Sequence, residues 1–136
     1  MTFDYTVTPE DTNIAGRAST QFKSVMKELG VPAQVIRALS IAMYEGEINM
    51  VIHANGGKIH CEIDNDKITV TMKDEGPGIP DIEKAMLPGW STASEEAREL
   101  GFGAGMGLPN IKKWSSSMEV DSKEGVGTTL TMTFNI

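Results

Sequence analysis

The fold class of this chain is decided by the stretch KIHCEIDNDKITVTMK, residues 58–73. Apolar and polar side chains alternate on both sides of a short polar turn, Asp64-Asn65-Asp66. A period of two is typical of a half-buried strand, and a polar turn between two such strands predicts a β-hairpin. Strands that arrive in hairpin pairs, rather than singly between helices, indicate an α+β fold.

The residues before this hairpin predict one strand and two helices. Residues 3–7 alternate like a strand, whereas apolar residues recur at spacings of three and four over 14–29 and again over 35–50. Such spacing puts apolar side chains on one face of a helix. Gly30 and Pro32 mark the break between the two helices, because glycine favours a helix end and proline a helix start.

The residues after the hairpin predict a further helix over 108–114, a short strand over 118–120 and a last strand over 129–136. Between them, residues 77–107 are rich in Gly, Pro, Ser and Glu, with a short helix over 81–86. A long irregular stretch in a compact domain is usually functional. We therefore expect a two-layer α+β sandwich, with helices on one face of a mixed, mostly antiparallel sheet.

Composition and charge exclude several classes of function. The 136 residues fit one compact domain, residues 1–136, and the net charge of −7 leaves no basic surface for nucleic acid. Cys61 is the one cysteine, which excludes an internal disulfide and a cysteine-cluster metal site. The chain begins without a signal-peptide pattern, and its apolar runs are too short to cross a bilayer. We expect a cytoplasmic protein that contacts neither nucleic acid nor membrane.

Glu45 and Asn49 lie four residues apart in the second predicted helix, so their side chains share one face. A carboxylate beside a carboxamide can polarise a nucleophile and hold a hard cation such as Mg²⁺. Taken alone, the two residues favour a solvated polar face of the helix over a catalytic pair.

Asp74 and Thr128 fall, by strand parity, on the apolar faces of their strands, which the helices must cover. A buried carboxylate requires a hydrogen-bond donor, and the exocyclic amine of adenine is one candidate. Gly76 and Gly78 would let a flat ring approach the backbone. The alternatives are an ordinary Gly-Pro-Gly turn and a core threonine with satisfied hydrogen bonds.

Glycine occupies every second position from Gly101 to Gly107, directly before the third predicted helix. Backbone amides in such a loop can surround an anion, and a helix N-terminus adds its dipole. The spacing matches neither the P-loop nor the dinucleotide-binding fingerprint. A phosphate-binding loop and a flexible linker are the two interpretations that the pattern allows.

Together, these four segments resemble the ATP-binding fold shared by type II topoisomerases, heat-shock chaperones, histidine kinases and mismatch-repair ATPases, the GHKL superfamily with its Bergerat-type fold. The motifs that carry the resemblance are, in chain order, Glu45-x-x-x-Asn49, Asp74-x-Gly76-x-Gly78, Gly103-x-Gly105-x-Gly107-Leu108 and Thr128. Within the superfamily, the chain resembles the small serine kinases of bacterial partner-switching modules. These are the anti-sigma-factor kinases and the switch kinases that phosphorylate STAS-domain antagonists.

The resemblance implies a role for each motif residue. Glu45 would be the general base on the protein hydroxyl, Asn49 the ligand of Mg²⁺, and Arg98 a lid arginine that reaches the γ-phosphate. The glycines over 103–107 would lie in a lid that closes over ATP. The residues implied to bind the nucleotide are Asn49, Asp74, Gly76, Gly78, Ile79, Thr92, Gly101, Gly103, Gly105, Gly107, Leu108 and Thr128.

The activity implied by the resemblance is that of an ATP-dependent serine/threonine kinase with ATP and Mg²⁺ as cofactors. It would transfer the γ-phosphate of ATP to a serine or threonine of a STAS-domain antagonist. The alternative is an anti-sigma factor that acts mainly by nucleotide-dependent sequestration of a sigma factor. Further implied partners are a serine phosphatase regulator and a second copy of the chain in a homodimer.

Overall fold

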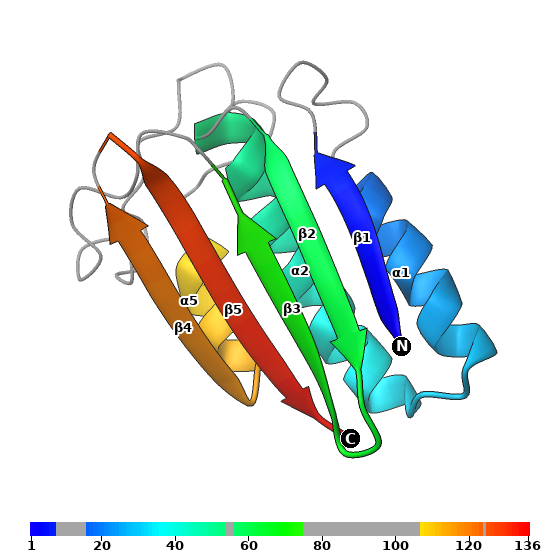
Figure 1. Ribbon diagram of the computed structural model, residues 1–136. Helices are drawn as coiled ribbons and strands as arrows, with labels where there is room; N and C mark the ends of the chain where they lie inside the picture. The colour runs from blue at the N-terminus through cyan, green and yellow to red at the C-terminus, as the bar shows by residue number, and fades with distance from the viewer. Residues whose placement is uncertain (8–15, 54–55, 75–106, 124) are drawn as a thin grey trace, which may run out of the picture.

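The computed structural model describes residues 1–7, 16–53, 56–74, 107–123 and 125–136. In chain order the elements are β1 (Thr2–Val7), α1 (Arg17–Glu28), α2 (Ala33–His53), β2 (Gly57–Ile63), β3 (Lys67–Lys73), α5 (Gly107–Trp114), β4 (Ser117–Lys123) and β5 (Gly127–Asn135) (Figure 1). Each helix and strand predicted within these residues is present. The short helix predicted over 81–86 lies outside the described residues.

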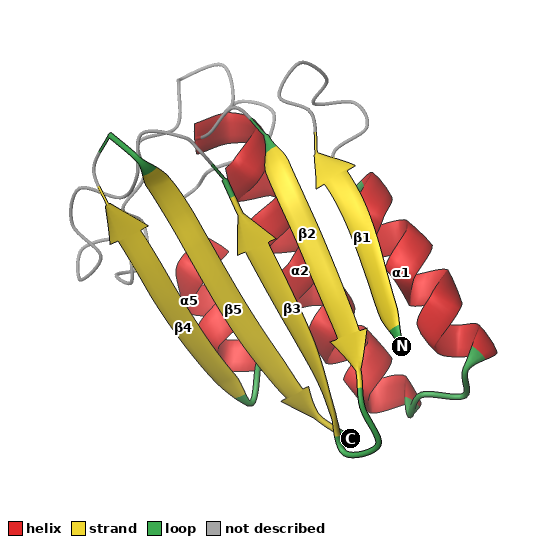
Figure 2. Ribbon diagram, in the orientation of Figure 1, coloured by secondary structure: helices red, strands yellow, loops and turns green. Residues whose placement is uncertain are grey.

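The five strands form one sheet in the order β1-β2-β3-β5-β4, and the described helices all lie on one of its faces (Figure 2). This arrangement confirms the predicted two-layer α+β fold. All four described strand pairings are antiparallel. Within the described residues the sheet therefore contains no parallel pair, whereas the sequence predicts a mixed, mostly antiparallel sheet. No helix in the described part of the chain is long and apolar enough to cross a membrane.

The core lies between the helices and the covered face of the sheet. Alternate residues of the central hairpin are buried there: Ile59, Cys61, Ile68, Val70 and Met72. From α1, Phe22 is fully buried, and its ring centroid lies 5.8 Å from that of Phe3 and 6.4 Å from that of Tyr5. The period of two in β1 and the period of 3.6 in α1 therefore describe the two sides of one packed layer.

Helix α1 ends where the sequence predicts. Gly30 has a φ of 75°, in the left-handed region that glycine adopts without strain. The N–H of Gly30 donates to the Lys27 carbonyl at 3.2 Å, and that of Val31 to the Met26 carbonyl at 3.1 Å. These bonds satisfy carbonyls at the helix end. The sequence placed Leu29 on the buried face, which is wrong: it is 45% exposed, because it is the capping residue beyond the last turn.

Helix α2 lies very close to the sheet at Gly46. A Cβ atom on Gly46 would overlap the sulfur of Met72 on β3 and would lie 3.6 Å from the Cε of Met132 on β5. A glycine inside a helix costs about 1 kcal/mol relative to alanine, so the close approach has to compensate for that cost. Because Gly46 stands between Glu45 and Glu47, the helix approaches the sheet closely at the turn that carries the candidate site.

Candidate functional site

Asp74 and Thr128 meet where β3 ends and β5 begins. The N–H of Asp74 donates to the Thr128 carbonyl at 2.9 Å, and the N–H of Thr128 donates to Oδ1 of Asp74 at 3.2 Å. Both residues are half-buried. The convergence predicted from strand parity is therefore confirmed, and the main chain of β5 holds the carboxylate in place. Recognition of adenine by this pair stays a prediction.

The hydroxyl of Thr128 extends the cluster to a third strand. It lies 2.9 Å from the Oγ of Ser122 on β4 and shares a hydrogen bond with it. Ser122 stands directly opposite Thr128 in the β4–β5 register. We did not single out Ser122 from the sequence, because its place next to Thr128 depends on a strand register that local periodicity does not specify.

Glu45 and Asn49 are both half-buried on α2, rather than on the fully solvated face that the two residues alone allowed. Helix α5 packs against α2 here, and Asn110 of α5 forms a side-chain hydrogen bond with the Glu45 carboxylate. Burial raises the pKa of Glu45, and the hydrogen bond from Asn110 offsets part of that rise. A raised pKa lies closer to neutral pH, and a carboxylate with such a pKa is a better general base.

Glu47 is a buried carboxylate that we did not single out from the sequence. Its side chain is 3% exposed, and its two oxygens accept the backbone N–H groups of Ala18 at 3.1 Å and Ser19 at 3.0 Å. The first N–H groups of a helix have no partner within it, and a negative charge there also interacts favourably with the helix dipole. Glu47 of α2 therefore caps α1 from outside.

The sequence did contain a signal for Glu47. It stands four residues after Met43 and three before Met50, and both methionines are buried. That spacing puts a carboxylate on the apolar stripe of α2, where only a satisfied carboxylate is tolerated. Asn110 had no comparable signal, because its contact with Glu45 joins two helices that are far apart in the sequence.

The remaining predicted residues divide into two groups. Helix α5 begins at Gly107, one residue before the predicted start at Leu108, and Leu108 is buried in its first turn. The other predicted site residues lie outside the described residues: Gly76, Gly78, Ile79, Thr92, Arg98, Gly101, Gly103 and Gly105. The predicted lid and phosphate-binding loop are therefore described only at their last two positions.

The described residues contain no group of His, Cys, Asp and Glu side chains that could hold a metal ion by themselves. Cys61 is fully buried, as the strand pattern predicts. His60 points to the other face, where its Nδ1 lies 2.7 Å from Oδ1 of Asp4, and the two side chains are 46% and 75% exposed. These residues belong to the packing and surface of the sheet.

Comparison with known proteins assigns the class. Residues 7–134 match the family described as the histidine kinase-like ATPase domain. The match spans nearly the whole chain, and the chain belongs to this family. The superfamily inferred from the four motifs is therefore confirmed, and membership of an ATPase family implies ATP binding.

Two curated relatives narrow the resemblance. The chain is 36% identical over 121 residues to an anti-sigma F factor of Caldanaerobacter subterraneus subsp. tengcongensis. The aligned region covers 85% of this chain and 81% of the relative. The chain is also 33% identical over 110 residues to the serine/threonine-protein kinase RsbT of Bacillus subtilis. This aligned region covers 78% of the chain and 77% of the relative. Both relatives match the branch that the sequence motifs resemble.

Solved structures agree on the fold. The crystal structure of the RsbU and RsbW domains of Rv1364c from Mycobacterium tuberculosis superposes with a TM-score of 0.68 at 16% identity, over 98% of this chain and 32% of that one. The mycobacterial sensor histidine kinase MprB superposes with a TM-score of 0.57 at 15% identity. The superposition covers 99% of this chain and 97% of MprB. At these identities the likeness concerns the fold alone.

Proposed function

We propose that the chain is an ATP-dependent serine/threonine protein kinase of a partner-switching module, with residues 1–136 as one nucleotide-binding domain. It would transfer the γ-phosphate of ATP to a serine or threonine of a STAS-domain antagonist. The observation that carries the proposal is the half-buried Glu45 with its raised pKa, four residues before Asn49, in a chain of an ATPase family. The relative named as a serine/threonine-protein kinase supports the same activity.

Glu45 would act as the general base. The acceptor oxygen forms a bond to the γ-phosphorus as the bond to the leaving oxygen of ADP breaks, and the hydroxyl proton goes to the Glu45 carboxylate. A side-chain hydrogen bond from Asn110 would orient this carboxylate. Asn49 offers a neutral, hard oxygen that suits Mg²⁺, and the ion would neutralise charge on the phosphates.

Asp74 and Thr128 would bind the adenine base. Their mutual hydrogen bonds fix the carboxylate at the edge of the covered sheet face before any ligand binds. A carboxylate held in this way accepts a hydrogen bond from an exocyclic amine without a large loss of side-chain entropy. Arg98 and the glycines of residues 101–107 stay the proposed contacts to the phosphates.

A second candidate function is that of an anti-sigma factor, which would act by nucleotide-dependent sequestration of a sigma factor. The relative named as an anti-sigma F factor favours it. The two functions are compatible, because one nucleotide site can both supply phosphate and select the partner. A serine phosphatase regulator and a second copy of the chain are further proposed partners.

The decisive experiment mixes the protein with labelled ATP, Mg²⁺ and each STAS-domain protein encoded beside its gene. We expect Glu45→Ala to bind ATP within about twofold of wild type, yet to lose at least about a hundredfold in phosphotransfer, the usual contribution of a general base. Asn49→Ala should also lose the Mg²⁺-dependent part of the affinity. Glu62→Ala, at an exposed position of β2, is the matched control and should behave as wild type.

Phosphotransfer at the wild-type rate by Glu45→Ala would remove the assignment of Glu45 as base. If no STAS-domain protein is phosphorylated while ATP changes the affinity for a sigma factor, the second candidate function replaces the first.

A further inference from the structure

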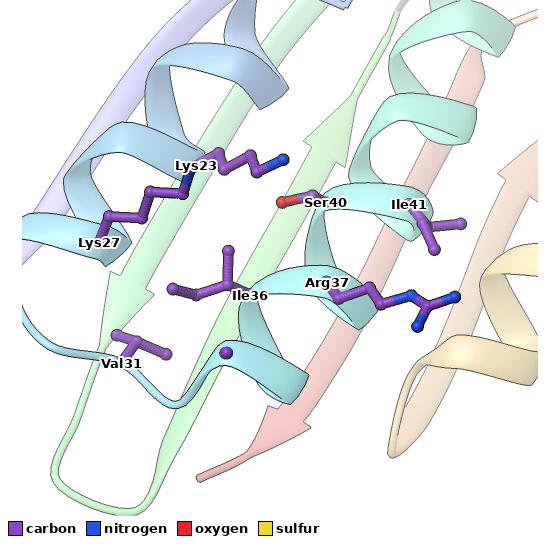
Figure 3. A pocket seen from close by; sticks show the side chains of 8 residues that line it. Lys23, Lys27, Val31, Ile36, Arg37, Ser40 and Ile41 are labelled. Carbon is purple, nitrogen blue, oxygen red and sulfur yellow. The ribbon is translucent and has the colours of Figure 1, made fainter.

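A groove of about 480 Å³ runs between α1 and α2 and is open to solvent. It is lined by the second half of α1, the connection between the helices and the first turns of α2 (Figure 3). The lining residues are Lys23, Lys27, Val31, Ala33, Ile36, Arg37, Ser40 and Ile41. Three of them are cationic and none is acidic, and none belongs to the candidate nucleotide site.

The charge of this groove is opposite to that of the protein. The chain has 12 basic and 19 acidic side chains and a net charge of −7, yet three of the basic ones line one groove. Within the described residues, neither Lys23 nor Lys27 forms an ion pair with an acidic side chain. The guanidinium of Arg37 extends away from α1 and lies 5.7 Å from the ring centroid of Trp114 on α5, so the positive charge of the groove comes from the two lysines (Figure 3). The groove is therefore a local positive patch.

The floor of the groove is apolar. Val31 and Ile36 contribute aliphatic side chains to it, and Val31 is only partly buried, whereas Ile41 points from α2 away from α1 (Figure 3). An aliphatic surface bordered by lysines gains stability when a partner covers the apolar part and pairs the charges. The combination matches an amphipathic segment rather than a small ion.

Ser40 adds an unmet hydrogen bond. In Figure 3 its hydroxyl points from α2 toward the space between the helices, on the side of Lys23. The Oγ atom is buried and has no hydrogen-bond partner among the described residues. Buried hydroxyls are nearly always paired, and an unpaired one costs free energy. Because the Oγ atom is buried, a polar group in the groove would reach it only after the side chain changes to another rotamer.

We propose that this basic groove is the docking site for an acidic amphipathic segment of a partner protein, which lays aliphatic side chains on the floor and carboxylates beside Lys23 and Lys27. The helix-in-groove mode fits an open channel between two helices. An anionic membrane is the less suitable occupant, because the net charge of −7 repels it over most approaches. The inference does not depend on phosphotransfer by Glu45.

The test uses the full chain, ¹⁵N-labelled, and a synthetic helical peptide of about 16 residues, long enough to be partly helical in water. The peptide carries leucines on one face and glutamates on both flanks of that face. We expect amide shifts that concentrate at Lys27, Ile36 and Ser40, and an affinity that falls as salt increases. The double variant Lys23→Glu/Lys27→Glu should weaken binding by at least about tenfold, because both charges are reversed.

Three controls make the result specific. Lys67→Glu makes a matched change at an exposed position of β3 and should leave the affinity within about twofold, as a charge outside the groove. A peptide of the same composition in scrambled order, and one with lysine in place of glutamate, should bind at least about tenfold more weakly. The milder pair Lys23→Gln and Lys27→Gln replaces the double reversal if circular dichroism shows that the reversal disturbs the fold.

The proposal fails if the scrambled peptide binds equally well, if the charge reversal changes nothing, or if no groove amide shifts at millimolar peptide. Binding to vesicles of anionic phospholipid, without binding to the peptide, would assign the groove to a membrane surface and also overturn the proposal.

Discussion

Ser19 donates its backbone N–H to the carboxylate of Glu47 at 3.0 Å, and this contact ties the start of α1 to the middle of α2. The second oxygen of the same carboxylate accepts the N–H of Ala18 at 3.1 Å. Glu47 stands two residues from Glu45 and two from Asn49. The position of α1 is therefore set by the same helical turn that carries the candidate catalytic face.

Glu47→Ala should destabilise the protein by about 2–4 kcal/mol, because two buried N–H groups lose their acceptor and the helix end loses its capping charge. Urea unfolding followed by circular dichroism measures the change. Glu47→Gln should fall between this variant and wild type, since it keeps one acceptor oxygen. Glu62→Ala, which is exposed on β2, should stay within about 0.5 kcal/mol of wild type. Equal stability of Glu47→Ala and wild type would show that the cap contributes nothing.

Asp74→Asn should leave the fold intact but weaken ATP binding by at least about tenfold, or 1.4 kcal/mol, because the ligand loses a charge-assisted hydrogen bond. The fold survives because the asparagine oxygen can still accept the N–H of Thr128, as Oδ1 does at 3.2 Å in the native protein. Titration calorimetry gives the affinity. Asp64→Asn, at an exposed site in the hairpin turn, is the matched control. Unchanged affinity in a folded Asp74→Asn protein would contradict adenine recognition by this residue.

The stability of the protein should depend on pH through Glu45. Burial raises the pKa of Glu45 above its ordinary value of 4.5, so the folded chain binds the proton more tightly than the unfolded chain. The stabilisation that protonated Glu45 contributes is therefore fully present below pH 4.5. It is lost as the pH rises through the raised pKa of Glu45 in the folded protein. Glu45→Gln cannot ionise, so its stability should increase relative to wild type over that range.

Urea unfolding of both proteins in steps from acid to neutral pH tests this dependence. Glu119→Gln, at an exposed position of β4, should show no such trend relative to wild type. A stability difference that does not change with pH would contradict the burial of the Glu45 charge.

Cys61 should resist thiol reagents in the folded protein. Its side chain is fully buried, and burial, with a smaller contribution from Asp4, raises the pKa of the thiol to about 12. The thiolate is the reactive form, so almost none is present at pH 8. Iodoacetamide labelling followed by mass spectrometry should proceed at the rate of unfolding and become rapid in urea. Fast labelling of the native protein would show that β2 opens locally.

Much of the architecture follows from local pattern. The alternation in residues 58–73 predicts the central hairpin, and the same parity brings Asp74 and Thr128 together across strands that are distant in the sequence. Parity is reliable here because a shift of one residue would turn every apolar side chain of the strand toward solvent. The motif spacing also predicts the family, which an independent comparison confirms.

The remaining contacts depend on tertiary packing. The bond between Glu45 and Asn110, and the pair of Ser122 with Thr128, need the placement of α5 and β4, which no local period specifies. The half-buried state of Glu45 has the same origin, because helical spacing gives the face but not the neighbour that covers it. The basic groove likewise joins α1 to α2, and its charge is concealed by the net charge of the chain.

Because β3 pairs with β5, the sheet cannot form completely until β5 has been synthesised. These two strands occupy the middle of the sheet, although β5 contains the last strand residues of the chain, and the contact of Thr128 with Asp74 spans 54 positions. During synthesis the hairpin of β2 and β3 leaves the ribosome before β5. The edge of β3 that pairs with β5 is unpaired until then, since contacts distant in sequence form late. A chain that has not yet released β5 lacks one half of the Asp74–Thr128 pair. If this pair binds adenine as proposed, the adenine site is complete only after β5 has been synthesised and has paired with β3.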